Sequence, residues 1–370
     1  MLNHYLRNQI QQQGGSISFA QFMQAALYHP EFGYYSTRAF QPGDFITAPE
    51  ISPLFAQCLA RQIQQIFAIL PEQNILEFGA GSGKLAKDLL LTLEQQNQLP
   101  AHYYIIEVSS LLIEQQKKLL REHCPQLIDR VQWLAALPAD FIGVVIANEV
   151  LDALPTHCFS IENEASKERR VTWQDDNFVW TAIPPQSEEL LEKIMALRQE
   201  YLLVNGYASE INLNYANFMQ PLAASVKQGI ILLIDYGYDR REYYQPARSR
   251  GTLMCFYQHH RQENPLIQVG EQDITAHVEF TTVAELAVAA DFNVAGYTHQ
   301  NAFLYACGLS ELAEKAAKTM NTIQQYQQSQ AIKTLVLPTE MGELIKVMAL
   351  TKGVEIPLLG FGLLDKRREL

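Results

Sequence analysis

A glycine-rich segment between a strand pattern and a helix pattern carries the residues with the clearest chemical role. Residues 74–86 read NILEFGAGSGKLA, in which an acid and three alternating glycines follow one another as Glu77, Gly79, Gly81 and Gly83. Glycine lets the backbone turn tightly and has no Cβ, so a ligand can lie against the chain. The helix that follows offers free N–H groups and the positive end of its dipole to an electronegative group. The segment therefore predicts a ligand-binding turn.

The spacing of the glycines separates three classes of ligand. A dinucleotide fingerprint requires a third glycine where this chain has Lys84. A phosphate-binding P-loop requires a glycine at the position of Phe78, and Ser or Thr at the position of Leu85. An acid followed by alternating glycines instead resembles the first motif of S-adenosylmethionine-dependent methyltransferases. The segment therefore favours S-adenosylmethionine as the cofactor.

A second acid lies at the end of the next strand pattern. Residues 102–110, HYYIIEVSS, predict a buried strand that ends at Glu107, and a second helix follows. An acid at this place, roughly 20 residues beyond the glycines, can accept the ribose hydroxyls of an adenosine. The alternative is a charge that complements the dipole of the following helix. Because NAD enzymes use the same acid, the glycine spacing and not Glu107 separates the two cofactors.

Strand and helix patterns alternate over most of the chain. Buried strands are predicted at 75–78, 102–107, 130–134, 141–149 and 229–237. Such alternation predicts a parallel, doubly wound sheet that binds ligands at the carboxyl ends of its strands. Two further segments, 294–300 and 343–351, are placed to close the sheet as an antiparallel pair.

The remaining segments predict additions to this core. We expect a helical and loop extension over 1–70, a core over 71–155 and 227–355, and an inserted lobe over 156–226. Within the extension, Ser18 and Gln21 have the spacing of a capping box. The insertion carries a polar two-stranded pattern with its turn at 175–177, then two helical stretches. The segment 238–278 reads as irregular.

Composition restricts the kinds of partner. The 370 residues carry a net charge of −12 and no strongly basic run, which argues against a nucleic-acid substrate held by phosphate contacts and suits a cationic protein partner. Five scattered cysteines without a C-x-x-C pair predict free thiols in a reducing compartment and no metal site. No stretch approaches 18 apolar residues and no apolar signal core is present, so we expect a cytoplasmic protein without membrane insertion.

Several segments together resemble one family, the MidA-like proteins. The segments, found in order between Tyr5 and Leu350, are GYYSTRAFQPGDFITAPEISPLF, LEFGAGSGKLA, IIEVS, ANEVLDALP, IDYG, GEQDITAHVEF and MGELIKVMAL. The resemblance implies an α/β fold of class I methyltransferases, Rossmann-like, with a seven-stranded, mostly parallel sheet, a helical N-terminal extension and an inserted α+β lobe. Ala80 and Ser82 replace the proline and the bulkier residue of some relatives, which leaves the glycines intact.

The same resemblance implies an activity. Mitochondrial members of the family are protein arginine methyltransferases needed for assembly of respiratory complex I, and symmetric dimethylarginine is their described product. The resemblance thus implies methyl transfer to an arginine of a protein partner, with a respiratory-complex subunit as one candidate. Two alternatives stand beside it: a small-molecule methyltransferase, and an assembly chaperone that binds S-adenosylmethionine without needing catalysis.

Methylation of arginine calls for carboxylates, because the guanidinium is always protonated and its lone pair is delocalised. A carboxylate bonded to it localises the charge and can take up the released proton. Glu149, at the end of the fourth strand, is the first candidate, although a carboxylate paired to a fixed basic side chain would look the same. Asp152 is a second carboxylate or a cap, and Glu210 completes a two-acid clamp or charges a helix N-terminus. His277 is a proton acceptor, an orienting residue or a structural histidine.

Other residues are expected around the cofactor. Trp133 either stacks near the adenine or belongs to the core. Asp44 and Glu50, together with Tyr34 and Tyr35, are expected to roof the cofactor or to line the substrate channel; the alternative for the aromatic residues is a local hydrophobic cluster. The predicted cofactor-binding residues are Glu77, Gly79, Ala80, Gly81, Gly83, Glu107, Val108, Trp133, Asn148, Asp44 and Glu50. The sequence gives no prediction of the oligomeric state.

Overall fold

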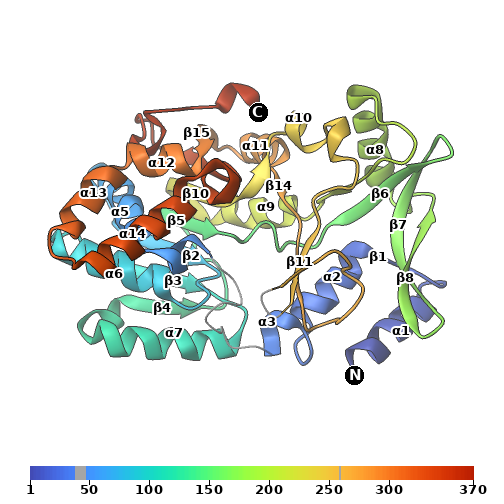
Figure 1. Cartoon of the computed structure of the whole chain (residues 1–370), viewed down its shortest axis with the longest axis horizontal. Helices are drawn as coiled ribbons and strands as arrows, with labels where there is room; N and C mark the ends of the chain where they lie inside the picture. Colours follow the sequence, from blue (N-terminus) through green and yellow to red (C-terminus); the bar gives the residue numbers. More distant parts are fainter. Residues whose placement is uncertain (38–46, 258–259) are drawn as a thin grey trace. The chain divides into compact units, whose positions relative to one another are not determined.

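The computed structural model describes residues 1–37, 47–257 and 260–370. Within them the chain forms two compact units, whose elements are labelled in Figure 1. One, here called the sheet unit, comprises the described residues within 45–150, 219–237 and 280–370. The other, here called the hairpin unit, comprises those within 1–44, 151–218 and 238–279. Asp44 lies outside the described residues.

Seven strands of the sheet unit follow one another in the order β15-β16-β10-β5-β2-β3-β4. They are β2 (Asn74–Phe78), β3 (His102–Ile106), β4 (Val131–Leu134), β5 (Phe141–Asn148), β10 (Val226–Tyr238), β15 (Asn293–His299) and β16 (Ile345–Lys352). The five strands β2, β3, β4, β5 and β10 are parallel to one another. Strand β16 pairs antiparallel with both β10 and β15. This confirms a mostly parallel sheet with a closing antiparallel pair, although the sheet has eight strands and not the expected seven, the eighth being the short β14 (Val278–Glu279).

Helices surround the buried strands of the sheet unit. They are α4 (Ala48–Ile51), α5 (Pro53–Phe67), α6 (Lys84–Gln95), α7 (Ser110–His123), α11 (Phe280–Ala289), α12 (Gln300–Ala306), α13 (Leu309–Ala317) and α14 (Thr322–Val336), while α9 (Tyr215–Ser225) contributes to both units. Alternate residues of β10, Ile230 and Leu232, join one core cluster with side chains of α5 and α6. The intervening Ile231 and Leu233 are equally buried. Because side chains alternate along a strand, both faces of β10 are covered.

The hairpin unit is built on an antiparallel sheet. Its strands are β1 (Ile17–Ser18), β6 (His157–Glu162), β7 (Ala165–Gln174), β8 (Asn177–Ile183) and β9 (Ala208–Ile211). A small three-stranded sheet consists of β12 (His260–Gln262), β11 (Met254–Tyr257) and β13 (Asp273–Thr275), in that order. The short strand β14 (Val278–Glu279) follows β13 in the chain. Its helices are α1 (Leu2–Gln12), α2 (Phe19–Tyr28), α3 (Tyr34–Thr37), α8 (Glu188–Tyr201) and α10 (Arg240–Tyr243).

The predicted turn of the insertion is confirmed, although three strands and not two surround it. Asp175 and Asp176 both have positive φ, +49° and +60°, between the paired residues Gln174 and Asn177. Two successive left-handed residues define the tight hairpin turn that matches the twist of the flanking strands. The capping box of Ser18 at the start of α2 is also present.

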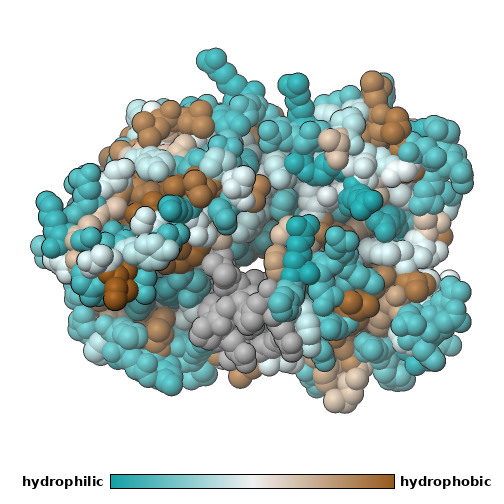
Figure 2. All heavy atoms as spheres, viewed as in Figure 1, coloured by the Kyte–Doolittle hydropathy of each residue, from teal (hydrophilic) through white to brown (hydrophobic). Residues whose placement is uncertain are grey.

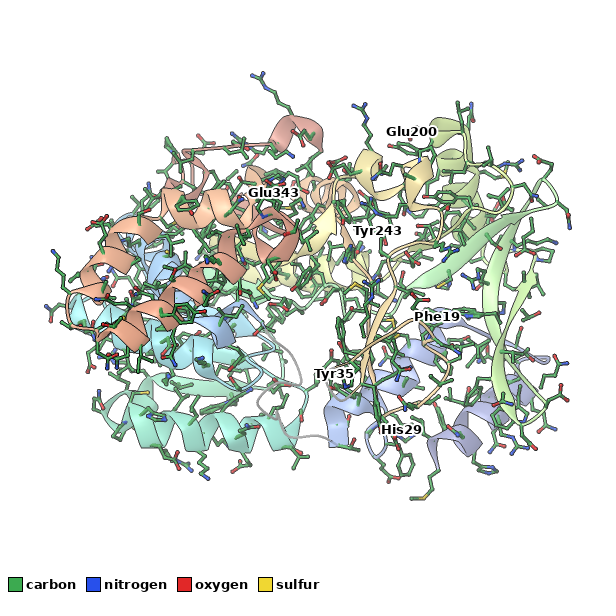
Figure 3. The ribbon with its side chains drawn as sticks, in the orientation of Figure 1. Phe19, His29, Tyr35, Glu200, Tyr243 and Glu343 are labelled. Atoms are coloured by element: carbon green, nitrogen blue, oxygen red, sulfur yellow. The ribbon has the colours of Figure 1, made fainter. Side chains whose placement is uncertain are left out.

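The boundaries of the two units differ from the domain boundaries that the sequence indicated. Phe19 of α2 packs on Trp180 of β8 with ring centroids 5.0 Å apart, and Phe22 packs on Phe178 at 5.5 Å (Figure 3 labels Phe19). The N-terminal helices therefore belong with the inserted strands, whereas α5 belongs to the core of the sheet unit. The segment 238–278, expected to be irregular, carries three strands of the hairpin unit. Periodicity shows that a helix has an apolar face, but not which distant segment covers it.

Hydrophilic side chains predominate on the face seen in Figure 2, with scattered hydrophobic patches between them. No described helix has both the length and the apolar character to cross a membrane. All five cysteines are buried free thiols. Within the described part of the chain, no cluster of His, Cys, Asp or Glu side chains is arranged to hold a metal ion.

Three neighbouring strands approach one another closely at glycines. A Cβ at Gly143 of β5 would lie 2.3 Å from the carbonyl oxygen of Asn74, and one at Gly229 of β10 would lie 2.0 Å from that of Gly143.

We expect Gly143→Ala to lower the free energy of unfolding by about 1–3 kcal/mol, because backbone must move to admit the methyl group. Urea unfolding measures this change. Gly362→Ala is the control, since its Cβ would meet only the Leu359 carbonyl oxygen at 3.4 Å, and equal effects of the two variants would contradict the prediction.

Candidate functional site

The glycine turn lies at the carboxyl end of β2, where the strand order reverses. β2 pairs in parallel with β3 on one side and with β5 on the other. Gly81 has φ +53°, and a Cβ built on it would meet no atom within 4 Å. The left-handed backbone favours glycine here, and the open space beside Gly81 is the cradle that a ligand would fill. Ligands of open parallel sheets bind at such a switch point.

Glu107 lies directly after β3, beside this turn. The N–H of Gly79 donates to the carbonyl oxygen of Ile106 at 2.9 Å, which joins the turn to the end of β3. Of the two carboxylate oxygens of Glu107, Oε1 accepts from the Ser109 N–H at 3.0 Å and Oε2 accepts from Nε2 of Gln116 at 3.2 Å. Burial raises the pKa of Glu107, and these hydrogen bonds oppose the rise. The helix-terminus interpretation thus describes the contact with Ser109, and acceptance of the ribose hydroxyls by this half-buried carboxylate remains a prediction.

Apolar surface lies open next to Glu107. Val108 is 73% exposed although its neighbours on β3 are mostly buried. Trp133 lies on β4, which pairs with β3. Its side chain is half-buried against the core and donates the indole N–H to Oε1 of Gln116 at 2.8 Å. Carboxylate, apolar surface and aromatic ring suit the ribose and the adenine of an adenosine. Contact of Val108 and Trp133 with the cofactor remains a prediction.

Glu50 of α4 binds the glycine turn itself. Its Oε1 accepts a short hydrogen bond from the Ser82 hydroxyl. Lys84, at the start of α6, donates through Nζ to the backbone carbonyl of Glu50 at 2.6 Å and lies 3.8 Å from Oε2. The residue that excluded a dinucleotide fingerprint therefore fastens α4 to the turn. This contact gives Glu50 a supporting role, and its direct contact with the cofactor stays a prediction.

Asn148 and Glu149 end β5 next to the turn, because Ala147 pairs with Phe78 of β2. Glu149 has φ +53°, and its N–H donates to the carbonyl oxygen of Ile234 at 2.8 Å. Nδ2 of Asn148 donates to Oε1 of Glu149 at 3.3 Å. Oδ1 of Asn148 is buried and accepts no hydrogen bond from any residue that the structure describes. An acceptor left over at this edge is available to a ligand donor.

Three predicted catalytic residues, Asp152, Glu210 and His277, belong to the hairpin unit, where hydrogen bonds link them. The carbonyl of Asp152 accepts from the Ala276 N–H at 3.0 Å, and the His277 N–H donates to Oγ1 of Thr252 at 3.1 Å. Thr252 in turn donates to Oε2 of Glu210 from its N–H at 2.9 Å and from its hydroxyl at 3.0 Å.

Glu210 is held deep in that network. It lies on β9, so its interpretation as a helix N-terminal charge is wrong. Burial raises the pKa of Glu210, while its bonds to Thr252 and to the hydroxyl of Tyr243 lower it. The Tyr243 hydroxyl, labelled in Figure 3, donates to Oε2 at 3.3 Å, and the Tyr244 hydroxyl donates to the Glu210 carbonyl at 3.0 Å. These hydrogen-bond partners are neutral, and the charge of Arg169 also lowers the pKa of Glu210.

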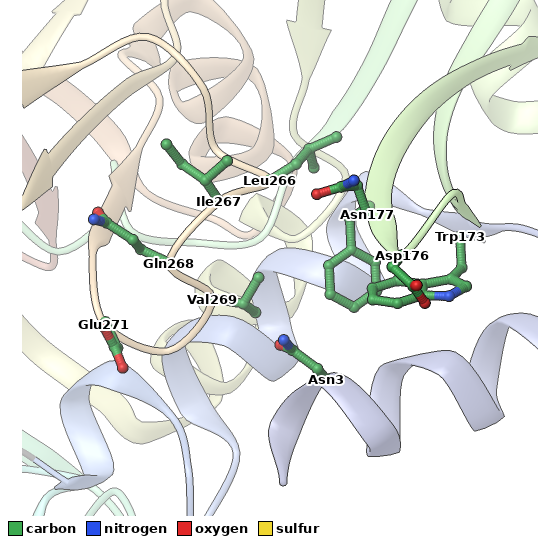
Figure 4. A pocket seen from close by; sticks show the side chains of 10 residues that line it. Asn3, Trp173, Asp176, Asn177, Leu266, Ile267, Gln268, Val269 and Glu271 are labelled. Carbon is green, nitrogen blue, oxygen red and sulfur yellow. The ribbon is translucent and has the colours of Figure 1, made fainter.

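The hairpin unit also contains a hollow of about 300 Å³, seen in Figure 4. It lies between α1, the β7–β8 hairpin and the segment 266–271, and Trp173 and Asp176 line it. None of the predicted site residues lines this hollow. It therefore carries no part of the argument about the cofactor.

Sequence reasoning missed four residues that support the site: Ser82, Tyr103, Gln116 and Asp235. Oδ2 of Asp235 accepts from the Val150 N–H at 3.1 Å, which fixes the turn after Glu149. Asp235 lies in the quoted motif IDYG and Ser82 lies within the glycine turn, so a signal for both was present. Gln116 and Tyr103 carried no signal, because nothing in a helix or strand pattern marks a side chain that reaches another element.

Glu77 is buried within the sheet and not at its surface. Its Oε2 accepts a hydrogen bond of 2.7 Å from the hydroxyl of Tyr103 on β3. Burial raises the pKa of Glu77 from its usual 4.5 to about 7; the Tyr103 bond lowers it and the charge of Glu107 raises it. Its direct contact with a cofactor stays a prediction.

The raised pKa of Glu77 predicts a pH dependence of stability. A carboxyl with a raised folded-state pKa stabilises the fold fully below its unfolded value, and this contribution is lost as the pH rises through about 7. We expect Glu77→Gln, which keeps an acceptor for Tyr103, to gain stability relative to the wild type between pH 5 and pH 8. Urea unfolding at both pH values measures the difference. The exposed variant Glu122→Gln is the control, and a difference for Glu77→Gln that stays constant between the two pH values would contradict the prediction.

Comparison with known proteins tests what these residues serve. Residues 58–298 match a family described as "Putative S-adenosyl-L-methionine-dependent methyltransferase". A Burkholderia thailandensis protein, solved with S-adenosyl-homocysteine bound, is 35% identical with a TM-score of 0.93 over 100% of this chain and 96% of that one. A second crystal structure from that organism is 37% identical with a TM-score of 0.92 over the same shares.

More distant relatives carry a more specific name, mitochondrial protein arginine methyltransferase NDUFAF7. The Drosophila melanogaster homologue is 26% identical over 94% of this chain and 85% of its own length. The human protein is 25% identical over 91% of this chain and 80% of its own length. The open cradle at Gly81, the acceptors of Glu107 and Asn148 and these matches agree. The chain belongs to the family of S-adenosyl-L-methionine-dependent methyltransferases that its residues 58–298 match, and S-adenosylmethionine is its cofactor.

Proposed function

We propose that the chain is a protein arginine N-methyltransferase. The observation that carries the proposal is Glu149, a carboxylate held in a left-handed conformation at the end of β5, next to the cofactor turn. The names of the relatives from Drosophila melanogaster and human support the same activity. An arginine side chain is the substrate that most needs a carboxylate at this place.

The backbone of Glu149 supports a functional role. A positive φ is uncommon for a long side chain and costs on the order of 1–2 kcal/mol relative to glycine. Such strain persists only where the surroundings enforce it, and it gathers at functional sites. Here the Glu149 N–H bonds to Ile234 and the next N–H, of Val150, bonds to Asp235, so β10 enforces the conformation.

The chemistry follows from these positions. When bound, S-adenosylmethionine supplies a methyl group on a positively charged sulfur, and transfer exchanges the S–CH₃ bond for an N–CH₃ bond. The carboxylate of Glu149 accepts hydrogen bonds from two guanidinium N–H groups and draws the positive charge towards them, which leaves electron density on the third nitrogen. The same carboxylate takes up the proton of one of the N–H groups that it binds and passes it to solvent, so that the methylated guanidinium keeps a single positive charge. Holding the nitrogen in line with the methyl group supplies most of the remaining rate.

The roles of Asp152, Glu210 and His277 in binding the substrate or accepting a proton remain predictions. A respiratory-complex subunit as the substrate, symmetric dimethylarginine as the product and a cytoplasmic location remain predictions.

Substitution of Gly81 tests the cofactor site. We expect Gly81→Val to abolish binding of S-adenosylhomocysteine, because its side chain would fill the space that now holds no atom within 4 Å of the Cβ position. Isothermal titration calorimetry measures the affinity. Gly14→Val is the matched control: Gly14 also has a positive φ, +79°, and open space around it, so it reproduces the backbone strain away from the turn. Unchanged affinity of the Gly81 variant would contradict the assignment.

Substitution of Glu149 tests the catalytic role. We expect Glu149→Gln to bind S-adenosylhomocysteine normally but to lose methyl transfer by about a hundredfold or more, because the amide neither neutralises the guanidinium nor accepts its proton. Glu164→Gln is the control, since Glu164 is an exposed glutamate with a similar positive φ of +60° in the β6–β7 turn. Full turnover by the Glu149 variant would show that the guanidinium is bound elsewhere.

The assay must identify the substrate as well as the rate. Labelled methyl groups from S-adenosylmethionine are offered to proteins of a lysate that lacks this protein, and labelled bands are hydrolysed for amino-acid analysis. Label in dimethylarginine that depends on Glu149 supports the proposal, and the isomer gives the product. Label only in small molecules would favour a small-molecule methyltransferase, and no label from protein that binds the cofactor would favour an assembly chaperone.

A further inference from the structure

Gln116, on the second turn of α7, is fully buried and makes three side-chain hydrogen bonds to the cofactor site. Its Nε2 donates to the carbonyl oxygen of Gly81 at 2.9 Å and to Oε2 of Glu107 at 3.2 Å. Its Oε1 accepts the indole N–H of Trp133 at 2.8 Å. One amide therefore joins the glycine turn after β2, the acid after β3 and the ring on β4.

The chemistry of the partners fixes the orientation of this amide. The indole nitrogen of Trp133 can only donate, so it requires the oxygen of Gln116. The carbonyl of Gly81 can only accept, so it requires the nitrogen. Both N–H groups and one lone pair are thereby used, and rotating the amide by half a turn would break all three bonds. The arrangement is fully determined without any ligand.

Backbone packing brings Gln116 to this position. A Cβ on Gly83, the third glycine of the motif, would lie 3.2 Å from both Cα and Cγ of Gln116. Contacts this short require the neighbour to move, so the absence of a side chain at Gly83 lets α7 approach the turn. Of the three glycines, Gly81 leaves room for the ligand and Gly83 leaves room for Gln116.

We propose that Gln116 is a positioning residue for S-adenosylmethionine, which sets the distance between the glycine turn, the ribose-binding carboxylate of Glu107 and the indole of Trp133 before the cofactor binds. Its N–H holds Oε2 of Glu107 from one side and favours the ionised form, which is the form that accepts hydrogen bonds from ribose hydroxyls. Gln116 touches no part of the cofactor in this scheme and acts through Glu107 and Trp133.

The first test removes the three hydrogen bonds and keeps the volume. We expect Gln116→Leu to weaken binding of S-adenosylhomocysteine by about tenfold or more, since it leaves a carboxylate, a carbonyl and an indole N–H without their partner. Gln126→Leu is the matched control. Gln126 also donates to a glutamate, both oxygens of Glu94 at 3.2 and 3.0 Å, but on the exposed surface of the same unit. Equal affinities of the folded Gln116 variant and the control would overturn the proposal.

A second variant separates positioning from simple packing. In Gln116→Glu the introduced carboxylate keeps the acceptor for Trp133 but loses both donors and places a like charge beside Glu107. Once protonated, it can donate again, and burial together with the charge of Glu107 raises the pKa of the new group. The charge of Glu107 also raises the pKa of Glu77, and Nζ of Lys117 lies 5.6 Å from the ring centre of Trp133.

The size of the effect of pH on affinity then differs between the variant and the wild type. We expect the affinity of Gln116→Glu for S-adenosylhomocysteine to rise at least about fivefold as the pH falls from 9 to 7, because protonation restores the donor to Glu107. The wild type is expected to change less than twofold over this range. Parallel pH profiles of the two proteins would overturn the proposal even if the leucine variant failed to fold.

Two further measurements need no cofactor turnover. The chain has three tryptophans, so an amide–nitrogen correlation spectrum resolves three indole N–H signals, and that of Trp133 should shift in ligand-free Gln116→Leu but not in Gln126→Leu. Binding to Glu107→Gln and to the double variant with Gln116→Leu completes a cycle. If Gln116 acts through Glu107, the two losses in affinity are less than additive; full additivity would overturn the coupling.

Discussion

The parallel register between β2 and β5 is the constraint on which the site depends. Because Phe78 pairs with Ala147, the residues that follow the two strands emerge at the same edge of the sheet. The glycine turn and Glu149 are thus neighbours although about 70 residues separate them in the chain. Burial of these strands on both faces fixes the register, since a slip by one residue would exchange the side chains of the two faces. The close approach of Asn74, Gly143 and Gly229 holds the opposite ends of the same strands together.

Negative charge gathers at this edge and is controlled by hydrogen bonds. Burial raises the pKa values of both Glu77 and Glu107. Glu149 follows β5, the strand that pairs with β2. A sulfonium cofactor carries a positive charge, so acids at the strand ends suit its presence. Each acid nevertheless has a neutral donor: Tyr103 for Glu77, Gln116 for Glu107 and Asn148 for Glu149. These hydrogen bonds orient the three carboxylates at this edge of the sheet.

The sequence predicted the sheet and the places of the glycine turn and of Glu107 because these features are encoded locally. Strand patterns, the three glycines and the acid after β3 depend on short-range periodicity and spacing, and the structure has them where they were expected. The grouping of the N-terminal helices with the hairpins was not predicted, because the contact of Phe19 with Trp180 joins segments 161 residues apart (180 − 19). For the same reason Gln116 gave no signal: its role lies in three partners on three different strand ends. The neighbourhood of Glu210 was unpredictable too, since its partner Thr252 lies on a segment that reads as irregular.

The left-handed backbone of Glu149 has an evolutionary consequence. Glycine adopts this conformation without strain, so exchange of Glu149 for glycine would release about 1–2 kcal/mol while removing the carboxylate. Mutational drift towards a more stable protein would therefore favour the loss of this residue wherever methyl transfer is not under selection. Under the proposed function, we expect relatives to keep a glutamate at this position where the reaction is under selection and to tolerate glycine where it is not.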